Sequence, residues 1–385
     1  MAIYYITFGT YKGLESFNLE SSPAALQKSN YVIEKLADAD FEFEVITLSE
    51  TGSHEFTIKH SQTVKCYENG SYTVWTTFGK PYRLFPTLHK YFRLHQLKKF
   101  LDTLCSADVV VVYHSLYISK LIVDMKQKKG FKLILELEEI YQDVVECSES
   151  LALCEKRVID IADGFILAVK NLLHEIPQNR PYIVINGTYK TEVDKSVSFN
   201  DNKIHCIYAG TFDTTKGGAA AAAATAEFLP SNYHIHILGF GTEKQKKELL
   251  ALIDRVQKKA KCTLTYDGLK SGEEYITFLQ KCHIGLCTQI PDAKYVETSF
   301  PSKILVYLAN GLRVLSARIP AVEKSDVGSL INYYNKQSPQ EIANAIMKID
   351  INDNFNPREH LKKLDVNCGK ALKDLINVVQ NENNR

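Results

Sequence analysis

The sequence predicts an α/β protein built from two Rossmann-like, doubly wound parallel-sheet domains. Short apolar runs of strand length alternate with stretches of helix length along most of the 385 residues. This alternation stops over the polar residues 188–203 and starts again at Ile204. Strand–helix alternation on this scale indicates βαβ units with right-handed crossovers. A chain of this length is also expected to form two domains. We expect the domains to face each other across a cleft at the carboxyl ends of their strands.

Residues 1–187 are predicted to form the first domain. Its expected strands are Ile3–Thr7, Phe43–Leu48, Val109–Tyr113, Leu133–Leu137, Gly164–Ala168 and Tyr182–Ile185, and its expected helices are Pro23–Leu36, Leu88–Leu104 and Leu151–Ala162. Two of these strands, Val109–Tyr113 and Leu133–Leu137, are continuously apolar, which is typical of a sheet covered on both faces. Residues 50–80 are polar and irregular, and Asn69-Gly70 marks a hairpin turn within them.

Residues 188–203 are interpreted as a linker, and residues 204–350 as the second domain. The run Ala219–Ala224 is expected to be a tightly packed helix, because alanine has the highest helix propensity. A further helix is expected over Ile304–Asn310, ended by Gly311. The tail, residues 351–385, begins with a polar stretch and then forms a helix over about Arg358–Val379, which is expected to pack back toward the first domain.

Composition excludes several classes of protein. Lys and Arg number 46 against 45 Asp and Glu, so the chain lacks the basic excess of a nucleic-acid-binding protein. The N-terminus has no basic n-region or long apolar segment, so a signal peptide is not expected. No apolar run reaches the ~20 residues of a membrane span. The nine scattered cysteines form no Cys-x-x-Cys pair and are expected to be free thiols. These features predict a cytoplasmic protein.

The most informative segment is residues 204–311, in which four glycine-bearing or basic turns follow one another. They are Tyr208–Thr211 with Lys216-Gly217-Gly218, then Leu238–Gly241, Asp267–Leu269 and Ser299–Lys303. Each turn opens onto, or lies just before, a helix-like run, so several helix N-termini are expected along one edge of a parallel sheet. Free backbone N–H groups and the positive ends of helix dipoles converge at such an edge. The sequence therefore predicts a site for an anionic ligand there.

In this order and spacing, the four turns resemble those of GT-B glycosyltransferases of the family-4, retaining type (group 1 glycosyl transferases). Ala162–Ile166 and Val184–Gly187 are similar to the end of the N-terminal domain of that family. The resemblance covers nearly the whole chain and is strongest over residues 204–320. It implies a GT-B architecture with an acceptor-side domain at residues 1–187 and a nucleotide-sugar-binding domain at residues 204–350. It also implies a hexosyltransferase that moves sugar from a nucleoside-diphosphate sugar with retention.

The resemblance places the donor site mainly in the second domain. Lys216 and Lys303 would stabilise the departing diphosphate, which gains negative charge as the glycosidic bond breaks. Further donor contacts are implied at Gly210, Thr211, Gly217, Gly239, Gly241, Leu269, Ser299, Phe300, Pro301 and Ser302. Thr211 stands where the family usually has an arginine. Gly239-x-Gly241 lacks the third glycine of a dinucleotide fingerprint, because that position is Lys244, and this argues against a dehydrogenase.

The helix after Ser302 carries another departure from the family. Val306 occupies the position of a glutamate that holds the donor ribose, and the second family glutamate falls at Thr298 or, with one residue of slip, at Glu297. We favour Glu297 for contact with the hydroxyls of the donor sugar. Losing a hydrogen bond to a charged group costs about 1.5–3 kcal/mol, roughly ten- to a hundredfold in affinity. Val306 therefore weakens or alters donor binding, or marks a chain that no longer transfers sugar.

In the first domain, Glu138 occupies the position of a family histidine that reaches the donor sugar. Glu138 or Glu139 is a candidate to bind sugar hydroxyls or to deprotonate the acceptor, the alternative being a solvated acidic turn. His114 ends the neighbouring strand and is either a catalytic candidate at the same edge or a structural residue. The first loop contains Gly9, which the resemblance places toward the donor phosphates.

No metal or other cofactor is expected, apart from the nucleotide sugar as co-substrate. His234 and His236 alternate along one strand, but no carboxylate or third histidine is near in sequence, so we interpret them as a polar strand face. Asp38 and Asp40 match the metal-binding Asp-x-Asp of another transferase fold. They lie between a helix and a strand, at the wrong end of a βα unit, and are interpreted as a surface turn.

The expected partners are a nucleotide-sugar donor and a glycan or lipid-linked acceptor. Lys80–Lys99 combines basic and aromatic residues without an acidic one, which suits either a peripheral face at the inner side of a membrane or a helix that packs its aromatic residues on the sheet. The leading hypothesis is a cytosolic, metal-independent, retaining glycosyltransferase, with polysaccharide biosynthesis as its expected setting. The alternatives are a non-catalytic GT-B-like partner subunit or glycan-binding scaffold and, less favoured, a sugar-nucleotide epimerase.

Overall fold

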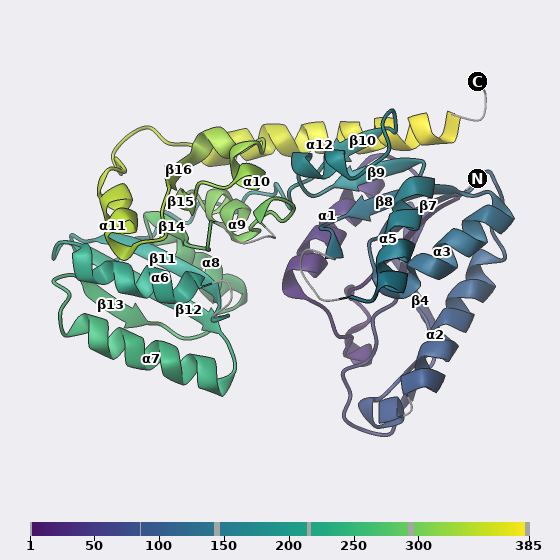
Figure 1. The fold of residues 1–385 in the computed structure, drawn as a ribbon, viewed down its shortest axis with the longest axis horizontal. Coiled ribbons are helices and arrows are strands. Elements are labelled where there is room, and N and C mark those ends of the chain that lie inside the picture. The colour runs from purple at the N-terminus through teal and green to yellow at the C-terminus, as the bar shows by residue number, and fades with distance from the viewer. Residues whose placement is uncertain (1, 85, 142–146, 214–216, 292–295, 382–385) are drawn as a thin grey trace. The chain divides into compact units, whose positions relative to one another are not determined.

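The computed structural model describes residues 2–84, 86–141, 147–213, 217–291 and 296–381. The chain divides into two compact units, of which unit 1 contains Met1–Thr188 and Val366–Arg385, and unit 2 contains Tyr189–Asp365 (Figure 1). Each unit is built on a mostly parallel sheet with helices on both faces. The predicted α/β class with two Rossmann-like bodies is thereby confirmed.

The sheet of unit 1 has the strand order β10-β9-β8-β7-β1-β2-β5-β4. Its strands are β1 (Ile3–Thr7), β2 (Phe43–Thr47), β4 (Gln62–Tyr67), β5 (Gly70–Val74), β7 (Val109–Tyr113), β8 (Lys132–Leu137), β9 (Gly164–Leu167) and β10 (Tyr182–Val184). Only β4 runs antiparallel to its neighbour, and the hairpin predicted at Asn69-Gly70 joins it to β5. The sequence analysis missed that β5 extends the parallel sheet beside β2, because the polar Ser71 and Thr73 hide its strand pattern. A separate two-stranded sheet pairs β3 (Ile58–Lys59) with β6 (Thr77–Phe78).

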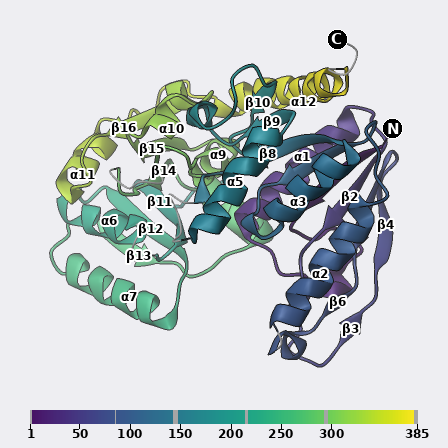
Figure 2. The same ribbon diagram turned by 45° about the vertical axis from the view of Figure 1, so that its right-hand side comes forward.

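The helices of unit 1 cover both faces of this sheet (Figure 2). They are α1 (Pro23–Asp38), α2 (Pro86–Leu101), α3 (Leu116–Lys129) and α5 (Glu149–Ile161), with short 3-10 turns at Glu15–Phe17, Lys80–Leu84 and Lys170–His174. On one face α3 packs between α2 and α5. On the other face lies α1, because right-handed crossovers place helices on opposite faces once the strand order reverses at β1. The sequence analysis did not assign α3, whose first turns carry the β-branched residues Ile118 and Ile122.

The sheet of unit 2 is entirely parallel, with the order β13-β12-β11-β14-β15-β16. Its strands are β11 (Ile204–Thr211), β12 (Tyr233–Phe240), β13 (Thr263–Tyr266), β14 (Ile284–Cys287), β15 (Arg313–Ala317) and β16 (Ile331–Tyr334). The chain builds outward from β11 on one side and then returns to β14 on its other side. The strand order therefore reverses between β11 and β14, and ligands of open α/β sheets bind outside the carboxyl ends of the strands at such a switch point.

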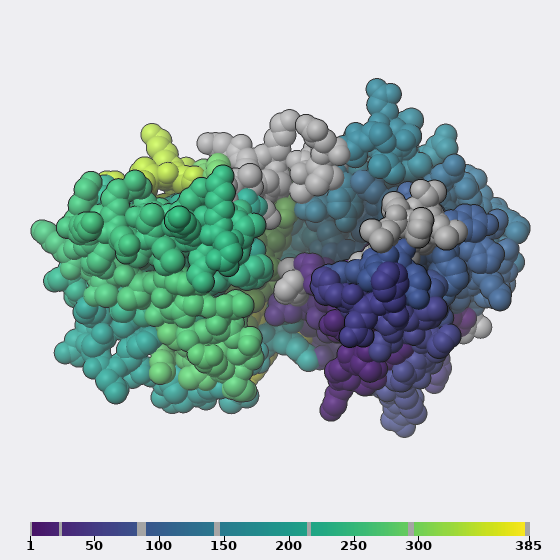
Figure 3. Space-filling model, turned by 90° about the horizontal axis from the view of Figure 1, so that it is seen from below, coloured from purple at the N-terminus to yellow at the C-terminus, as the bar shows by residue number. Residues whose placement is uncertain are grey.

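The helices of unit 2 are α6 (Gly218–Thr225), α7 (Glu243–Gln257), α8 (Gly272–Gln280), α9 (Lys303–Ala309), α10 (Pro320–Glu323) and α11 (Pro339–Met347), with 3-10 turns at Ala226–Phe228 and Gly328–Leu330. The predicted alanine helix is α6, which packs between α7 and α11 on one face. The helix α7 begins with a capping box between Thr242 and Gln245. Its outer side chains contribute to the green surface of unit 2 in Figure 3.

The last helix, α12 (Pro357–Asn381), starts in unit 2, and its residues from Val366 onward cluster with unit 1. A Cβ atom on Gly164 of β9 would lie 2.7 Å from Val379 and 3.2 Å from Leu375, so α12 packs directly on that strand. None of the nine cysteines forms a disulfide. Within the described part of the chain, no helix has the length and apolar character needed to cross a membrane.

Replacing Gly285 with alanine is expected to destabilise unit 2 by about 1–3 kcal/mol, because overpacking a filled core costs that much. Gly285 lies in β14, and a Cβ atom there would come within 2.3 Å of the buried Tyr307 ring. Urea unfolding measures the change. The control is Gly369→Ala in α12, where the nearest neighbour would lie 3.6 Å away. That control should be neutral or slightly stabilising, and equal stability of the two variants would contradict the packing argument.

Candidate functional site

The carboxyl ends of β11 and β12 meet at an unusually close backbone approach. Gly210 and Gly239 are register partners. Gly239 has a φ of +138°, and a Cβ atom on it would lie 1.7 Å from the Gly210 carbonyl oxygen. Its N–H donates to the carbonyl of Gly268, at the end of β13, over 3.1 Å. Only glycine fits at position 239, so the backbones of β11 and β12 approach closely one residue before these strands end.

Lys303 supplies a positive charge to these strand ends. It is the first residue of α9, and its Nζ lies 3.9 Å from the centroid of the Tyr208 ring. A Cβ atom on Gly210 would lie 2.8 Å from the same Nζ, so the ammonium group rests against the backbone of β11. Among the described residues, no carboxylate forms an ion pair with Lys303. The face of the Tyr208 ring therefore holds the ammonium group in place, and its charge remains available to bind an anion.

The first turn of α6 lies beside the same ring. Gly217, at a φ of +64°, precedes the first turn of α6. A Cβ atom on Gly218 would lie 2.8 Å from the Tyr208 ring, and the Thr288 hydroxyl donates to the Gly218 carbonyl over 2.7 Å. Lys216, the leading catalytic candidate from the sequence, lies outside the described residues.

The other donor-side candidates differ in their exposure to solvent. Thr211, Gly241, Leu269 and Ser302 are exposed, Ser299 and Pro301 are half-buried, and Phe300 is buried. Glu297 is exposed, whereas Thr298 is buried and its hydroxyl has no hydrogen-bond partner in the described structure. Val306 is half-buried on α9. The sequence analysis missed Tyr208, which looks like an ordinary strand residue until the fold places Lys303 over it.

Unit 1 carries a second polar cluster at the carboxyl end of β8. The fully buried Glu136 accepts a hydrogen bond from the Tyr5 hydroxyl at 2.5 Å. Lys28, on α1, forms an ion pair with Glu138 and lies 3.9 Å from Glu136. Burial raises the pKa of Glu136 to about 7, against the opposing effect of the Lys28 charge. The cluster thus holds a carboxyl group that titrates near neutral pH.

His114, at the end of β7, is enclosed beside this cluster. Its Nε2 lies 3.3 Å from Glu155, and its ring lies 4.9 Å from the ring of Tyr141. Burial lowers the pKa of His114 to about 4, so the ring is neutral at neutral pH and its contact with Glu155 is not an ion pair. Gly9, after β1, donates its N–H to the Thr47 hydroxyl over 3.2 Å.

Sequence reasoning named Glu138 and His114 as candidates but missed the side chains that they contact, Lys28 and Glu155. The sequence did contain a clue to the role of Lys28. Val32 follows it by four residues and Leu36 by eight, so Lys28 lies on the apolar stripe of α1. A lysine on such a stripe must either reach solvent or meet a buried carboxylate. The structure therefore has two clusters of polar side chains, one at the carboxyl ends of the strands in each unit.

No protein-family model matches the chain, and no curated protein matches it. Solved structures do. One described as trehalose-6-phosphate from E. coli bound with UDP-2-fluoro glucose is 10% identical over 99% of each chain, with a TM-score of 0.66. Sucrose-phosphate synthase from Thermosynechococcus elongatus is 14% identical over 98% of this chain and 99% of that one, at 0.68. Anabaena Alr3699/HepE in complex with UDP and glucose is 11% identical over 100% of both, at 0.61.

These proteins are GT-B glycosyltransferases, and the likeness extends over whole chains. The chain therefore has the GT-B fold that the order of its glycine turns implied. At 10–14% identity the likeness defines the fold. The activity has to be argued from the chain's own residues.

Replacing Glu136 with glutamine is expected to flatten the dependence of stability on pH. A carboxyl group whose pKa is raised by folding stabilises the native state below about pH 4.5, and this contribution is lost as pH rises through about 7. Between about pH 5 and about pH 8 the wild-type chain should therefore lose on the order of 2 kcal/mol more than Glu136→Gln. Urea unfolding at both pH values tests this. The exposed Glu68→Gln serves as control and should follow the wild type; parallel curves for all three chains would contradict the argument.

Proposed function

We propose that this protein is a glycosyltransferase that moves a hexose from a nucleoside-diphosphate sugar to a hydroxyl group, with retention and without a catalytic metal. The observation that carries the proposal is the position of Lys303. Its ammonium group lies at the switch point of a parallel sheet, against a backbone edge cleared of side chains, with no carboxylate partner among the described residues. A diphosphate would pair with the ammonium charge of Lys303 and would bind where ligands of open α/β sheets bind.

The chemistry follows from where charge develops. As the bond between the sugar and the diphosphate breaks, negative charge accumulates on the leaving phosphate oxygens. A pre-positioned ammonium group stabilises that charge more than it stabilises the ground state, which lowers the barrier. Lys303 takes this role here, together with Lys216 as the second candidate. The charges of these two lysines would take the place of the divalent metal of other transferases, which is why we propose metal-independent transfer.

The solved structures support a uridine nucleotide. The E. coli structure is bound with UDP-2-fluoro glucose, and the Anabaena structure is a complex with UDP and glucose. We extend this to the present chain as a proposal for the donor. The acceptor is a glycan, a lipid-linked glycan or another hydroxyl compound. We assign its activation to unit 1, where Glu138 is held by Lys28 at the end of β8.

A second candidate function rests on Val306 and Thr211. They stand where the resemblance implies a glutamate and an arginine, and Val306 is only half-buried on α9. A GT-B module that binds a nucleotide or glycan without transferring sugar would tolerate both replacements. Binding and turnover must therefore be measured separately.

Replacing Lys303 with methionine is expected to weaken UDP binding ten- to a hundredfold, because a charge-assisted hydrogen bond contributes about 1.5–3 kcal/mol. Isothermal titration calorimetry with UDP measures the affinity. The matched control is Lys281→Met, since Lys281 also lies over an aromatic ring, that of Phe199, at 5.6 Å. The control should bind UDP as the wild type does. Undiminished affinity of Lys303→Met would remove the central assignment.

Turnover separates the two candidate functions. A donor-hydrolysis screen with several nucleotide sugars should release nucleoside diphosphate from the wild-type chain, and both Lys303→Met and Lys216→Ala should slow this release. UDP binding without release from any donor, in the presence of glycan acceptors, would favour the non-catalytic module.

We further propose that unit 1 rests on an anionic membrane surface, in keeping with a role in polysaccharide biosynthesis at the inner face of a membrane. Exposed aromatic side chains support this: Phe56 is 73% exposed and Tyr91 69% exposed. The Phe56 ring packs against Tyr82, 5.3 Å away, so these apolar groups cluster beside the basic segment Lys80–Lys99.

Phe56→Ser combined with Tyr91→Ser is expected to reduce flotation with phosphatidylglycerol vesicles several-fold, because interfacial binding scales with the apolar area inserted. The control is Val366→Ser on α12, which removes an equally exposed apolar side chain outside the cluster. Flotation that is absent from the wild type, or equal in all variants, would contradict membrane contact.

A further inference from the structure

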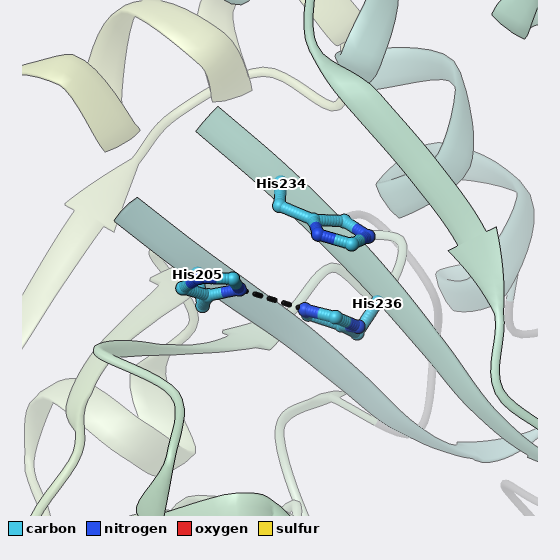
Figure 4. Close-up of side chains that lie close together, drawn as sticks. All are labelled: His205, His234 and His236. Atoms are coloured by element: carbon cyan, nitrogen blue, oxygen red, sulfur yellow. Dashed lines mark hydrogen bonds between the residues drawn. The ribbon is translucent and has the colours of Figure 1, made fainter. Parts of the chain in front are cut away.

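Three histidines gather on one face of the unit 2 sheet, away from the donor edge. His205 lies on β11, and His234 and His236 lie on β12 (Figure 4). The parallel register places His205 beside His234, and strand alternation places His236 on the same face. From their sequence positions, His205 lies roughly 16 Å along β11 from Gly210, at ~3.3 Å per residue. This group, the histidine cluster, is therefore separate from the site at Lys303.

The inner nitrogens of the cluster converge. His205 Nδ1 and His236 Nε2 are 2.9 Å apart. One ring nitrogen from each of the three histidines lies within 4.8 Å of one from each of the others. Nitrogen ligands of a tetrahedral zinc ion, at ~2.0–2.1 Å from the metal, lie a little over 3 Å apart. The His234 ring stacks on the His236 ring, with centroids 3.8 Å apart and 28° between the planes, so metal binding requires the His234 ring to rotate until its lone pair points between the other two.

The outer nitrogens are turned toward hydrogen-bond acceptors. His205 Nε2 donates to Asp201 Oδ1 over 2.7 Å, and His236 Nδ1 donates to Asp267 Oδ2 over 3.0 Å. An ionised carboxylate only accepts hydrogen bonds, so each of these outer nitrogens carries the hydrogen. In a neutral imidazole the other nitrogen is then a bare lone pair. The lone pairs of His205 and His236 therefore face each other at 2.9 Å, which requires a positive species between them.

The third ring fits the same pattern. The Thr265 hydroxyl donates to Asp267 over 2.7 Å and accepts from His234 Nε2 over 3.0 Å. This leaves His234 Nδ1 as its lone-pair nitrogen. Carboxylates that hold the outer N–H of a histidine are the usual supports of metal-binding histidines, because they fix the ring and raise the basicity of the inner nitrogen.

We propose that His205, His234 and His236 bind one first-row transition-metal ion of the zinc class. Three imidazoles suit zinc, copper, nickel or cobalt and not magnesium or calcium, which prefer oxygen ligands. A metal supplies the positive charge that the facing lone pairs of His205 and His236 require. Asp201 and Asp267 act as positioning residues that hold the rings.

The surroundings indicate a structural role for the metal. The Phe199 ring stacks on His205 at 4.1 Å and on His236 at 5.0 Å, and the Phe278 ring of α8 lies 5.2 Å from His236. A metal here would join β11 to β12 and hold in place the rings on which Phe199 and Phe278 pack. Sequence analysis set the two strand histidines aside because the third histidine is 31 residues from His236 and the carboxylates come from other segments. The proposal is independent of sugar transfer.

The full-length protein, stripped with a chelator and dialysed, is titrated with Co²⁺ and with Zn²⁺. We expect one equivalent of Co²⁺ to bind with the visible absorption of a tetrahedral site, Zn²⁺ to displace it, and Zn²⁺ to raise Tm. The variants are His205→Gln, His236→Gln and the half-exposed His234→Ala, the last being least demanding for folding. Each should weaken Zn²⁺ binding at least about a hundredfold, and Asp267→Asn about ten- to a hundredfold.

The matched control is His360→Gln, a histidine of the same unit that contacts the Asp326 carbonyl and not the cluster. It should bind Zn²⁺ as the wild type does. Circular dichroism of each variant separates loss of ligand from loss of fold, and the Co²⁺ titration of the wild type needs no variant. Absence of saturable binding by the wild type would overturn the proposal and leave a proton shared between the imidazoles. Binding that survives in the folded His205→Gln/His236→Gln double variant would overturn it equally.

Discussion

The close approach of two strand ends in unit 2 is the constraint on which the candidate site depends. Gly239 leaves no room for a Cβ atom, because the Gly210 carbonyl oxygen occupies that space. The ends of β11 and β12 therefore form a bare edge, over which Lys303 is held by the Tyr208 ring. A lysine held by a π face loses little conformational freedom when an anion arrives, and it brings no carboxylate that the anion would have to displace.

Unit 1 buries a carboxyl group at the carboxyl ends of its own strands. Glu136 is fully buried, and an isolated carboxylate there would be expensive. Lys28 and the Tyr5 hydroxyl compensate for part of that cost, but the pKa of Glu136 still rises to about 7. Buried pairs of this kind contribute little net stability relative to apolar packing. A buried carboxyl group with the raised pKa of Glu136 is more typical of functional sites than of a structural core.

The two ends of strands β11 and β12 suit ligands of opposite charge. Their carboxyl ends lie beside the ammonium group of Lys303, which suits an anion, whereas the histidines nearer their amino ends present lone pairs, which suit a cation. Both arrangements depend on the same parallel register. A shift by one residue would turn the histidines to the opposite face and separate Gly210 from Gly239. The two sites are therefore linked through the pairing of these strands, although they use different chemistry.

The sequence by itself determined the class of fold, the restart of the βαβ pattern at Ile204 and the positions of the glycine turns. These are local properties: apolar periodicity and glycine at positions of positive φ act over a few residues. Periodicity failed at α3, where β-branched residues weaken the helix pattern, and at β5, where serine and threonine hide a strand. Only the tertiary structure decided which distant side chains meet. Lys28 with Glu136, Lys303 with Tyr208, and His205 with His236 are each joined by strand order and register, which depend on the packing of whole layers and leave no mark in the local sequence.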